Sequence, residues 1–477
     1  MTRTMADLPS PKGLPIIGNA HQLVFDTKRM HQPMEKWGRE LGPMFRIDLG
    51  PKRAVLVTSD PEIVADVLRR RPDEFRRSGN LAKLAGELFG IDTGLFFAEG
   101  AEWKHQRAFV MAALNTKHLK RYFSVVNRTG GRMHERLHRL AASGESINVG
   151  REFNLYAVDV ATSLAFGQDL NTVGKGDNEF RRLYESVLDR VVARLLMPVP
   201  YWRVKALRLP VDRKAQRDAA IIIASLRGWL EEGRQRLRDN PDLFEHPETP
   251  LDAMIAEQMT TGAFSDDDIV GNMSTLLFAG QDSIAQTLAW TFWLVSANPR
   301  VQQRLRDEAD EVLGEHPFPT DIDMSSKLEY ADAVLRESMR LRTVSPAFAA
   351  DAIVDTYVGD VFVPKGTEIG LLGRLATSID APDQADFRPE RWLEEGPKLP
   401  KTLTFGSGPR YCPGRNLALA EARGALAMMS RDFDLRLDPS APPVTEKLHF
   451  AMSPSEVRVF LTPRARVSRK EAAAQVA

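Results

Sequence analysis

Apolar residues at helical spacing fill most of the chain, whereas β-like runs are short and fall in three separate places. From residue 93 to residue 343 nearly every stretch has helical periodicity. Strand-like runs occur at residues 44–58, 352–372 and 443–462. Distant parts of the chain supply these runs, and no internal repeat or linker divides the sequence. The pattern therefore predicts a mainly α protein with a small β region (α+β), forming a single domain over residues 1–477.

The ends of the chain and its first elements have patterns of their own. Proline-dense residues 8–20 indicate a lead-in without regular structure, either a stiff surface segment or a disordered tail. A helix is predicted over residues 30–41, followed by a hairpin of residues 44–50 and 53–58. A second helix is predicted over Pro61–Arg70, with Asp60 as its N-cap. Residues 464–477 are polar and alanine-rich, which indicates a frayed tail.

Charge and composition narrow the class of protein. The 64 Lys and Arg residues balance the 64 Asp and Glu residues, which argues against a nucleic-acid partner. The single cysteine excludes a disulfide framework and suits a reducing cytoplasm. The sequence has no run of about 18 apolar residues and no signal-like apolar stretch at its start. We therefore expect a cytoplasmic protein without a membrane span.

The one cysteine, Cys412, lies in the segment FGSGPRYCPG at residues 405–414, whose three glycines and two prolines predict a tight loop. A helix predicted directly after the loop places Cys412 at a helix N-terminus, where free N–H groups favour a thiolate. Gly408 and Gly414 would let backbone amides approach the sulfur, and Arg410 is placed to meet a second anion. A buried apolar cysteine is the plainer alternative. A role of Cys412 as a catalytic nucleophile is disfavoured because no histidine lies near it in the sequence. A zinc site is disfavoured because the chain has only one cysteine sulfur.

The spacing F-x-x-G-x-R-x-C-x-G of this loop resembles the haem-thiolate loop of the cytochrome P-450 family, in its soluble bacterial type. The hairpin and the proline-rich lead-in are more similar to fatty-acid-hydroxylase-like and eukaryotic-like members. The resemblance implies a triangular prism of about a dozen helices, with haem b between a distal and a proximal helix. It also implies that Cys412 is the iron ligand and that Phe405, Gly408, Arg410 and Gly414 contact the haem.

Trp103 and Arg107 stand four residues apart in a helix predicted to open at Gly100, so they share one face. Such a pair is often a stacking contact on a helix surface. Beside the cysteine loop it resembles the family's W-x-x-x-R, which implies hydrogen bonds to the haem propionates. Many members add an arginine after the proline at position 346, where this chain has Ala350. We therefore expect Trp103, Arg107 and Arg410 to hold the propionates.

An apolar helix predicted over residues 266–297 contains a glycine and two polar residues at its centre, which is costly unless they have a function. The run around Gly280 resembles the family's A-G-x-[DE]-T-T, where the helix loosens over the haem. The resemblance implies that Ala279 contacts the haem and that Asp282 and Ser283 relay protons to iron-bound dioxygen. The family's two threonines are replaced by Ser283 and Ile284, so chemistry without a proton relay stays open.

Two further motifs predict a buried charge cluster. Glu337 and Arg340 stand three residues apart on a helix predicted over Tyr330–Leu341, where an ordinary surface ion pair is the plain alternative. They resemble the family's E-x-x-R, and residues 389–392 resemble its P-E-R-[FW]. The resemblance implies that Glu337, Arg340 and Arg391 form a triad that supports the cysteine loop without taking part in catalysis.

The motifs together imply a monooxygenase that inserts one oxygen atom into a lipophilic small molecule, such as a fatty acid, terpenoid, steroid or polyketide. The sequence contains no flavin or nicotinamide module, so we expect electrons from NAD(P)H through a separate ferredoxin or flavodoxin and its reductase. A basic collar of exposed cations would attract such acidic partners to a monomeric enzyme: Lys104, Lys117, Lys120, Arg121 and Arg415. A solvated charged face is the alternative for each of these residues.

Mostly apolar segments near the proposed haem predict a lipophilic substrate pocket, although each residue suits a core equally well. They are Leu84, Leu88, Phe89, Leu95, Phe96, Thr275, Phe278, Val344, Ala347, Phe348, Met452 and Ser453. Three other functions stay open. An iron-thiolate rearrangement or dehydration enzyme would need no reductant, a peroxygenase would use peroxide alone, and a haem sensor would need an output domain.

Overall fold

The computed structural model describes residues 3–50, 53–91, 94–195, 197, 199–377, 385–394 and 402–464, without the side chains of residues 116 and 117. The frayed tail predicted for residues 464–477 lies outside the described residues except for its first position. The helices that the structure describes include none with the length and hydropathy of a membrane span.

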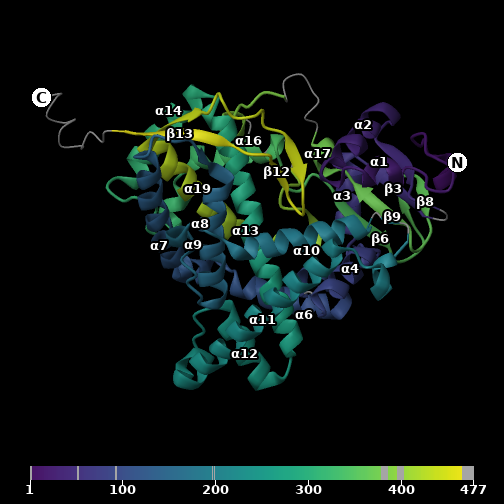
Figure 1. The fold of residues 1–477 in the computed structure, drawn as a ribbon, viewed down its shortest axis with the longest axis horizontal. Coiled ribbons are helices and arrows are strands. Elements are labelled where there is room, and N and C mark those ends of the chain that lie inside the picture. Colours follow the sequence, from purple (N-terminus) through teal and green to yellow (C-terminus); the bar gives the residue numbers. More distant parts are fainter. Residues whose placement is uncertain are drawn as a thin grey trace, which may run out of the picture.

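Helices make up most of the described chain and form the bulk of the molecule (Figure 1). In chain order they are α1 (Ala20–Val24), α2 (His31–Leu41), α3 (Pro61–Arg69), α4 (Gly79–Phe89), α5 (Gly94–Phe97), α6 (Gly100–Ala113), α7 (Thr116–Ala141), α8 (Val149–Phe166), α9 (Thr172–Lys175), α10 (Glu179–Leu195), α11 (Pro210–Asp239), α12 (Pro250–Thr261), α13 (Asp266–Ser296), α14 (Pro299–Leu313), α15 (Ile322–Ser326), α16 (Glu329–Leu341), α17 (Gly373–Ala376), α18 (Arg391–Glu394) and α19 (Arg415–Asp432).

The strands form small sheets that combine distant parts of the chain. The five-stranded sheet has the order β2 (Met44–Asp48), β3 (Ala54–Thr58), β9 (Glu368–Leu371), β6 (Phe348–Ala352) and β4 (Phe75–Arg77). A second sheet joins β10 (Phe433–Leu437), β13 (Arg458–Pro463) and β5 (Ile147–Asn148), and a third joins β1 (Arg3–Thr4), β8 (Val361–Val363) and β7 (Thr356–Val358). Strands β11 (Glu446–Leu448) and β12 (Met452–Pro454) form an antiparallel pair.

The β-rich part and the helical part occupy different sides of the molecule. The five-stranded sheet lies with α1, α2 and α3 on one side, whereas α7, α8, α14 and α19 gather on the other (Figure 1). Helices α11 and α12 lie at the bottom of this view. The predicted mainly α fold with a small β region is confirmed, and most of its strands come from the separate stretches that the sequence indicated.

Several predicted elements are confirmed closely. The hairpin is β2 paired antiparallel with β3, with Met44 opposite Thr58. The Asp60 side chain accepts hydrogen bonds from the backbone N–H groups of Glu62 and Ile63, so it caps α3 as expected. Strands β1, β4, β5 and β10 lie outside the three predicted stretches. Strand β4 has the short, charged sequence Phe-Arg-Arg, which carries no strand signal of its own.

Helix α13 crosses the interior and is buried along most of its length. Its N-terminus has a capping box: the Ser265 hydroxyl accepts from the Asp268 N–H at 3.1 Å, and the Asp268 carboxylate accepts from the Ser265 N–H at 2.8 Å. A Cβ added at Gly280 would lie 3.3 Å from the Cβ of Ala161 in α8. The glycine therefore allows α13 and α8 to pack closely, which explains why it interrupts an apolar helix.

A buried ionic network joins the N-terminal part of the chain to the C-terminal part. The Arg374 guanidinium in α17 donates two hydrogen bonds of 2.8 Å to Glu35 in α2 and one of 2.7 Å to Glu446 in β11. The Glu446 carboxylate also lies 2.9 Å from Nε2 of His31. Because Arg374 and Glu35 are buried and paired with complementary geometry, the network fixes α2 against α17 and β11.

Candidate active site

The cysteine loop is closed by its own backbone. The Cys412 N–H donates to the Phe405 carbonyl at 2.9 Å, and the Gly406 N–H donates to the Leu403 carbonyl at 2.8 Å. Gly406 and Gly408 have φ angles of +71° and +68°, in the left-handed region that favours glycine. A 3₁₀ turn over Gly408–Arg410 then leads to Cys412, three residues before α19 begins.

The two glycines beside the cysteine have different surroundings. A Cβ at Gly408 would lie 2.3 Å from the backbone oxygen of Leu68 in α3, so only glycine fits and the loop is held against α3. A Cβ at Gly414 would lie 3.9 Å from the Cys412 sulfur, which is ordinary van der Waals contact. The structure thus places Gly408 against a neighbouring helix and Gly414 beside the sulfur.

The electrostatics around the Cys412 thiol act in opposite directions. Burial raises the pKa of the thiol, while hydrogen bonding to the Gly414 N–H and the charges of Arg107 and Arg415 oppose the increase. The net pKa is raised, so the helix N-terminus alone does not supply the predicted thiolate. A metal cation bound to the sulfur would remove the proton, because a coordinating thiol is deprotonated outright.

Trp103 of α6 contacts Arg410 of the cysteine loop, and the charge of Arg107 from the same helix acts on Arg410. The Arg410 guanidinium carbon lies 4.5 Å from the centre of the Trp103 ring, and Nη2 of Arg410 lies 2.6 Å from a carboxylate oxygen of Glu99. The Arg107 guanidinium stacks 4.7 Å above the ring of Tyr411. The three side chains lie near the loop that carries Cys412.

Two further arginines, Arg71 and Arg77, which no motif in the sequence indicates, lie beside these residues. The Arg77 guanidinium lies 3.7 Å from the centre of the Phe96 ring. The backbone N–H of Arg77 donates a hydrogen bond to the Glu99 carboxylate. Burial lowers the pKa of Arg71 to about 10, with repulsion from Arg410 adding to the effect. Burial also lowers the pKa of Arg77, which is repelled by both Arg71 and Arg410.

The position of Arg77 explains how the chain can lack the arginine that many family members have at the position of Ala350. In the antiparallel pair β4–β6, Arg77 stands directly opposite Ala350. Directly opposed residues in an antiparallel pair have their side chains on the same face. The long side chain at Arg77 therefore extends on the face where Ala350 has only a methyl group. This register could be known only after β4, a strand without a strand signal, had been placed.

Arg71, Arg77, Arg107 and Arg410 together form what we call the arginine group. It has more buried hydrogen-bond donors than the acceptors of the described residues satisfy. Among the described residues, Glu99 is the carboxylate that contacts this group. Buried nitrogen atoms of all four arginines nevertheless have no hydrogen-bond partner among the described residues. These atoms are Nε and Nη2 of Arg71, Nε of Arg77, Nη2 of Arg107 and Nε of Arg410. Buried guanidinium groups that repel one another are stable only with additional negative charge, so this site fits an anionic group.

Helix α13 presents the predicted distal residues without a break. The Ser283 hydroxyl donates to the Ala279 carbonyl at 2.7 Å, and the Thr287 hydroxyl donates to the Ser283 carbonyl at 2.8 Å. The helix is continuous through these residues, which differs from the loosened turn that the resemblance implies. Ala279 is exposed and Ser283 half-buried, although α13 is otherwise mostly buried, so this face of the helix is accessible.

Asp282 faces a polar environment. Burial raises the pKa of Asp282, and the carboxylate accepts a hydrogen bond of 2.9 Å from Gln286. Gln286 lines a polar cavity of about 260 Å³ together with Arg181, Glu185 and His449. The charges of these last three residues also act on Asp282, and Gln286 connects the carboxyl group to the cavity.

Glu337, Arg340 and Arg391 form the predicted cluster. Arg340 donates two hydrogen bonds to Glu337 at 2.8 and 2.9 Å, and Arg391 donates one at 2.9 Å. The Trp392 indole N–H also donates to Glu337 at 2.9 Å. Burial alone would raise the pKa of Glu337, but the contacts with Arg340, the Arg388 N–H and Trp392 together outweigh it and the net pKa is lowered. Arg340 lines a small cavity with Leu403, the residue whose carbonyl closes the cysteine loop.

The residues proposed for a substrate pocket divide into groups. Phe96 and Phe278 lie 5.4 Å apart between ring centres, and both lie within 5.3 Å of Phe450, which the sequence analysis did not include. Leu84, Leu88 and Phe89 pack in the same buried cluster as Phe278, whereas Leu95 belongs to a neighbouring cluster. These contacts bring an apolar, aromatic surface to the part of α13 that precedes Ala279.

The other candidates for the pocket lie in varied surroundings. Thr275, on α13, and Val344 are buried, Ala347 is exposed and Phe348 half-buried. Met452 is fully buried and its carbonyl accepts from the Trp290 indole at 3.3 Å, which gives it a packing role. Ser453 lines the polar cavity instead of the aromatic surface.

The basic collar is described in part. Lys104, Arg121 and Arg415 are exposed. Lys120 forms an ion pair of 2.8 Å with Asp323, which reduces its attraction for a partner. The side chain of Lys117 lies outside the described residues.

Comparison with known proteins identifies one family over nearly the whole chain. Residues 8–461 match the family model described as "Cytochrome P450". The chain is similar to "Protein LUTEIN DEFICIENT 5, chloroplastic" of Arabidopsis thaliana, with 29% identity over 84% of this chain and 69% of the relative. It is also 28% identical to "Carotene epsilon-monooxygenase, chloroplastic" of the same plant, over 92% of this chain and 84% of the relative.

A third relative is a fungal protein, "Self-sufficient cytochrome P450 monooxygenase CYP505E4" of Penicillium expansum. The identity is 27% over 97% of this chain and 44% of the relative. These relatives are eukaryotic and two are named as chloroplastic, so they support neither the bacterial type nor the cytoplasmic location expected from the sequence.

The residues present fit a haem. A half-buried cysteine thiol, whose proton a metal would remove, lies in a rigid loop before α19. The arginine group has unsatisfied buried donors, which suit the two carboxylates of haem b. The cysteine and the arginine group are brought together by Arg107, whose charge acts on both Cys412 and Arg410.

Proposed function

Because the chain belongs to the cytochrome P450 family, and is thus a haem-thiolate monooxygenase that takes electrons from NAD(P)H through redox partners, we propose that it oxidises a lipophilic small molecule. The match over residues 8–461 supports a single haem domain. The reaction is hydroxylation or epoxidation of a fatty acid, terpenoid, steroid or polyketide. When bound, the haem supplies the oxygen activation that this chemistry needs.

Cys412 holds the haem iron, and the arginine group holds the propionates. The observation that carries this assignment is the set of buried nitrogens on Arg71, Arg77, Arg107 and Arg410 that have no partner among the described residues. A propionate carboxylate accepts charge-assisted hydrogen bonds from such donors and relieves their mutual repulsion. Trp103 stacks against Arg410 and keeps its guanidinium in place.

Asp282 and Ser283 deliver protons to the accessible face of α13. The raised pKa of Asp282 lets its carboxyl group hold a proton closer to neutral pH than an exposed aspartate does. Gln286 holds the group at the edge of the polar cavity, from which solvent protons can arrive. The Ser283 hydroxyl must turn away from the Ala279 carbonyl to donate, and a serine turns more freely than a threonine.

The aromatic surface of Phe96, Phe278 and Phe450 supports a lipophilic substrate. The name of one relative, a carotene monooxygenase, agrees with an apolar substrate. The exposed cations Lys104, Arg121 and Arg415 support docking of a separate, acidic ferredoxin or flavodoxin, which passes electrons from its reductase.

The test is turnover under ¹⁸O₂ by the purified holoenzyme with NADPH, a surrogate ferredoxin and its reductase, on a panel of the four substrate classes. We expect a product with one labelled oxygen atom, formed only with reductant. Before turnover, the ferrous–carbonyl form should show a strongly red-shifted Soret band, which Cys412→Ala abolishes and the loop control Ser407→Ala retains.

Three outcomes would contradict the proposal. A carbonyl band at the position typical of histidine-ligated haem would exclude Cys412 as the ligand. Product formation without any reductant would favour a rearrangement or dehydration. Product that forms with peroxide but never with the ferredoxin system would indicate a peroxygenase.

A further inference from the structure

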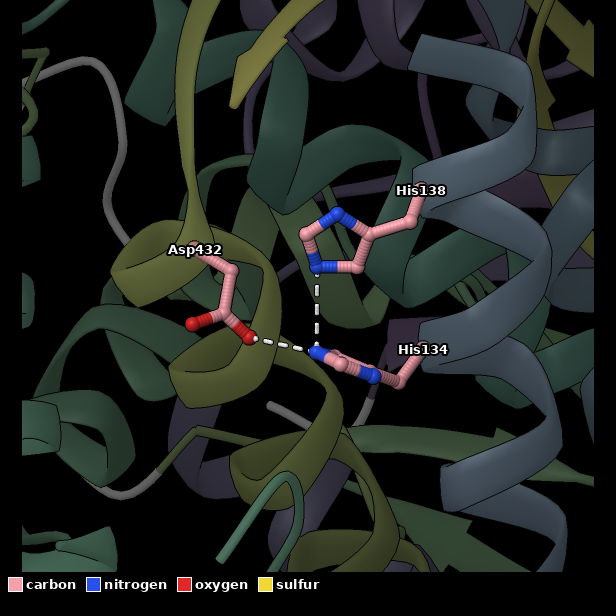
Figure 2. Close-up of side chains that lie close together, drawn as sticks. All are labelled: His134, His138 and Asp432. Atoms are coloured by element: carbon pink, nitrogen blue, oxygen red, sulfur yellow. Dashed lines mark hydrogen bonds and ion pairs between the residues drawn. The ribbon is translucent and has the colours of Figure 1, made fainter. Parts of the chain in front are cut away.

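Three potential metal ligands meet where helix α7 passes the end of α19. Nε2 of His134 lies 3.1 Å from Nε2 of His138 and 3.0 Å from Oδ2 of Asp432. Figure 2 shows both imidazole rings projecting from the same side of α7, with the Asp432 carboxylate facing them from the end of α19. All three ligand atoms lie within 4.8 Å of one another. The cluster takes no part in the active site described above.

The sequence of α7 has a spacing suited to metal binding. Residues 134–138 read His-Glu-Arg-Leu-His, the pattern H-E-x-x-H on a helix. Two histidines four residues apart stand on the same helical face and can share one ion. Glu135 between them is exposed, so the geometry supports binding of an ion and not hydrolysis at a metal.

The observed separations agree with a tetrahedral ion. Zinc binds imidazole nitrogen and carboxylate oxygen at about 2.0–2.2 Å, which places neighbouring ligand atoms about 3.3 Å apart in a tetrahedron. The separations of 3.1 and 3.0 Å at His134 are close to that value. The arrangement therefore needs only small side-chain movements to accept an ion.

Hydrogen bonding alone accounts poorly for this convergence. A neutral imidazole nitrogen is either a donor or an acceptor. Nε2 of His134 faces two electron-pair donors, Nε2 of His138 and the Asp432 carboxylate, and one proton cannot point at both. A metal cation bound by all three atoms satisfies them together, whereas an additional proton would still leave Nε2 of His134 with only one donor or acceptor site.

The surroundings hold the carboxylate in position. Arg431 donates to Asp432 at 2.9 and 3.1 Å, and the same guanidinium donates to the His316 carbonyl at 2.7 Å. Ligating carboxylates are commonly oriented by such outer hydrogen bonds. The positive charge of Arg431 offsets part of the attraction of Asp432 for a cation. The two neutral imidazoles then dominate, which favours transition metals over Mg²⁺ or Ca²⁺.

We propose that His134, His138 and Asp432 bind one divalent transition metal of the zinc class. The His134 side chain is 19% exposed, so an ion can enter from solvent, and a water molecule can complete the coordination. The ion ties the C-terminal part of α7 to the last residue of α19, the helix that follows the Cys412 loop. This site is independent of the function proposed above.

The experiment uses holoenzyme without a polyhistidine tag, freed of metals with EDTA and titrated with ZnCl₂ in a calorimeter at neutral pH. We expect one ion per chain and a higher melting temperature with zinc than with EDTA. In His138→Gln and in Asp432→Asn, zinc should bind more than about a hundredfold more weakly, since even outer-sphere partners change affinity about 10–100-fold. His118→Gln, on the same helix but outside the cluster, should bind zinc like the unaltered protein.

The proposal would be overturned if the unaltered protein bound no zinc. Equal binding by both ligand variants and the unaltered protein would place the ion elsewhere and also overturn it. The ferrous–carbonyl band checks that each variant is folded and loaded with haem. Mg²⁺ at the same concentrations should leave the zinc affinity unchanged, and competition by Mg²⁺ would contradict the assigned class of metal.

Discussion

At the scale of single residues, the buried charges around Glu99 have the largest consequences. Arg71, Arg77, Arg107 and Arg410 are drawn into a small volume, and the pKa of each is lowered, in each case mainly by burial. A bound dicarboxylate changes this balance, because it replaces repulsion between guanidinium groups by ion pairing. Each arginine therefore affects the stability of the folded protein differently when haem is bound and when it is absent.

We expect Arg77→Gln to weaken haem retention. A hydrogen bond to a charged group contributes about 1.5–3 kcal/mol, so haem should leave roughly 10- to 100-fold faster. The measurement is transfer of haem to an excess of apomyoglobin. In the haem-free protein the same change removes repulsion from Arg71 and Arg410, so it should raise the free energy of unfolding.

The neighbouring Arg76→Gln is the matched control. Arg76 lies on the same strand but its side chain is 49% exposed, so haem loss should stay at the rate of the unaltered protein. Equal rates of haem loss in all three proteins would show that Arg77 does not hold a propionate.

The sequence located part of this residue-scale arrangement. Trp103, Arg107, Arg410 and Cys412 have fixed spacings, and the structure brings them together. Arg77 could not be identified in the same way, because its role depends on facing Ala350 across two strands far apart in the chain. The His134 and His138 pair has a recognisable spacing, but the approach of Asp432 depends on how α7 crosses α19.

At the scale of elements, the contact between α13 and α8 determines where the distal residues lie. Gly280 brings α13 within 3.3 Å of the Ala161 methyl group, measured from an added Cβ. The predicted bounds of this helix, residues 266–297, agree with Asp266–Ser296 because capping and apolar periodicity are local signals. The identity of the helix that packs against Gly280 is not a local property, and the sequence left it open.

We expect Gly280→Val to destabilise the holoenzyme by about 1–3 kcal/mol, because overpacking forces two helices apart. The midpoint of urea unfolding should fall accordingly, and Ala161→Gly in the same protein should restore part of the loss. Gly228→Val in α11 is the matched control. An added Cβ there meets no atom within 4 Å, so stability should be unchanged or slightly higher.

An unchanged midpoint in Gly280→Val would mean that α13 and α8 can separate without cost. A loss in Gly228→Val of the same size would trace the effect to valine in a helix and not to the contact. Either result would remove the packing explanation for Gly280.

At the scale of the whole molecule, the ionic network around Arg374 joins residues more than 400 positions apart in the sequence, from His31 to Glu446. Burial alone would raise the pKa of Glu446, but its contacts with His31, Arg374 and Arg342 lower it to about 2. The charged carboxylate therefore stabilises the folded protein. Its contribution is complete above the ordinary glutamate pKa and is lost as the pH falls towards the lowered value.

We expect the free energy of unfolding to fall between about pH 4.5 and pH 2, with Glu446 contributing up to about 1.4 kcal/mol per pH unit. Glu446→Gln should be less stable near neutral pH, because Arg374 and His31 lose a charged partner. Its stability should nevertheless decline less steeply with acid. Chemical denaturation at a series of pH values measures both effects.

Glu40→Gln, on the exposed side of α2, controls for the loss of one surface charge. The interpretation fails if the acid slopes of Glu446→Gln and the unaltered protein coincide. The interpretation would also be contradicted if Glu40→Gln flattened the pH dependence of stability by the same amount. Loss of any carboxylate would then explain the effect, and Glu446 would have no special role.

The arginine group around Glu99 also bears on how the protein is made. A newly synthesised chain must gather Arg71, Arg77, Arg107 and Arg410 before its core is complete, and these side chains repel one another until a dicarboxylate arrives. Folding and acquisition of the prosthetic group are then thermodynamically coupled, because haem binds the folded chain and stabilises it. We expect the amount of mature protein in a cell to follow the supply of haem, with the unfilled chain left to proteolysis.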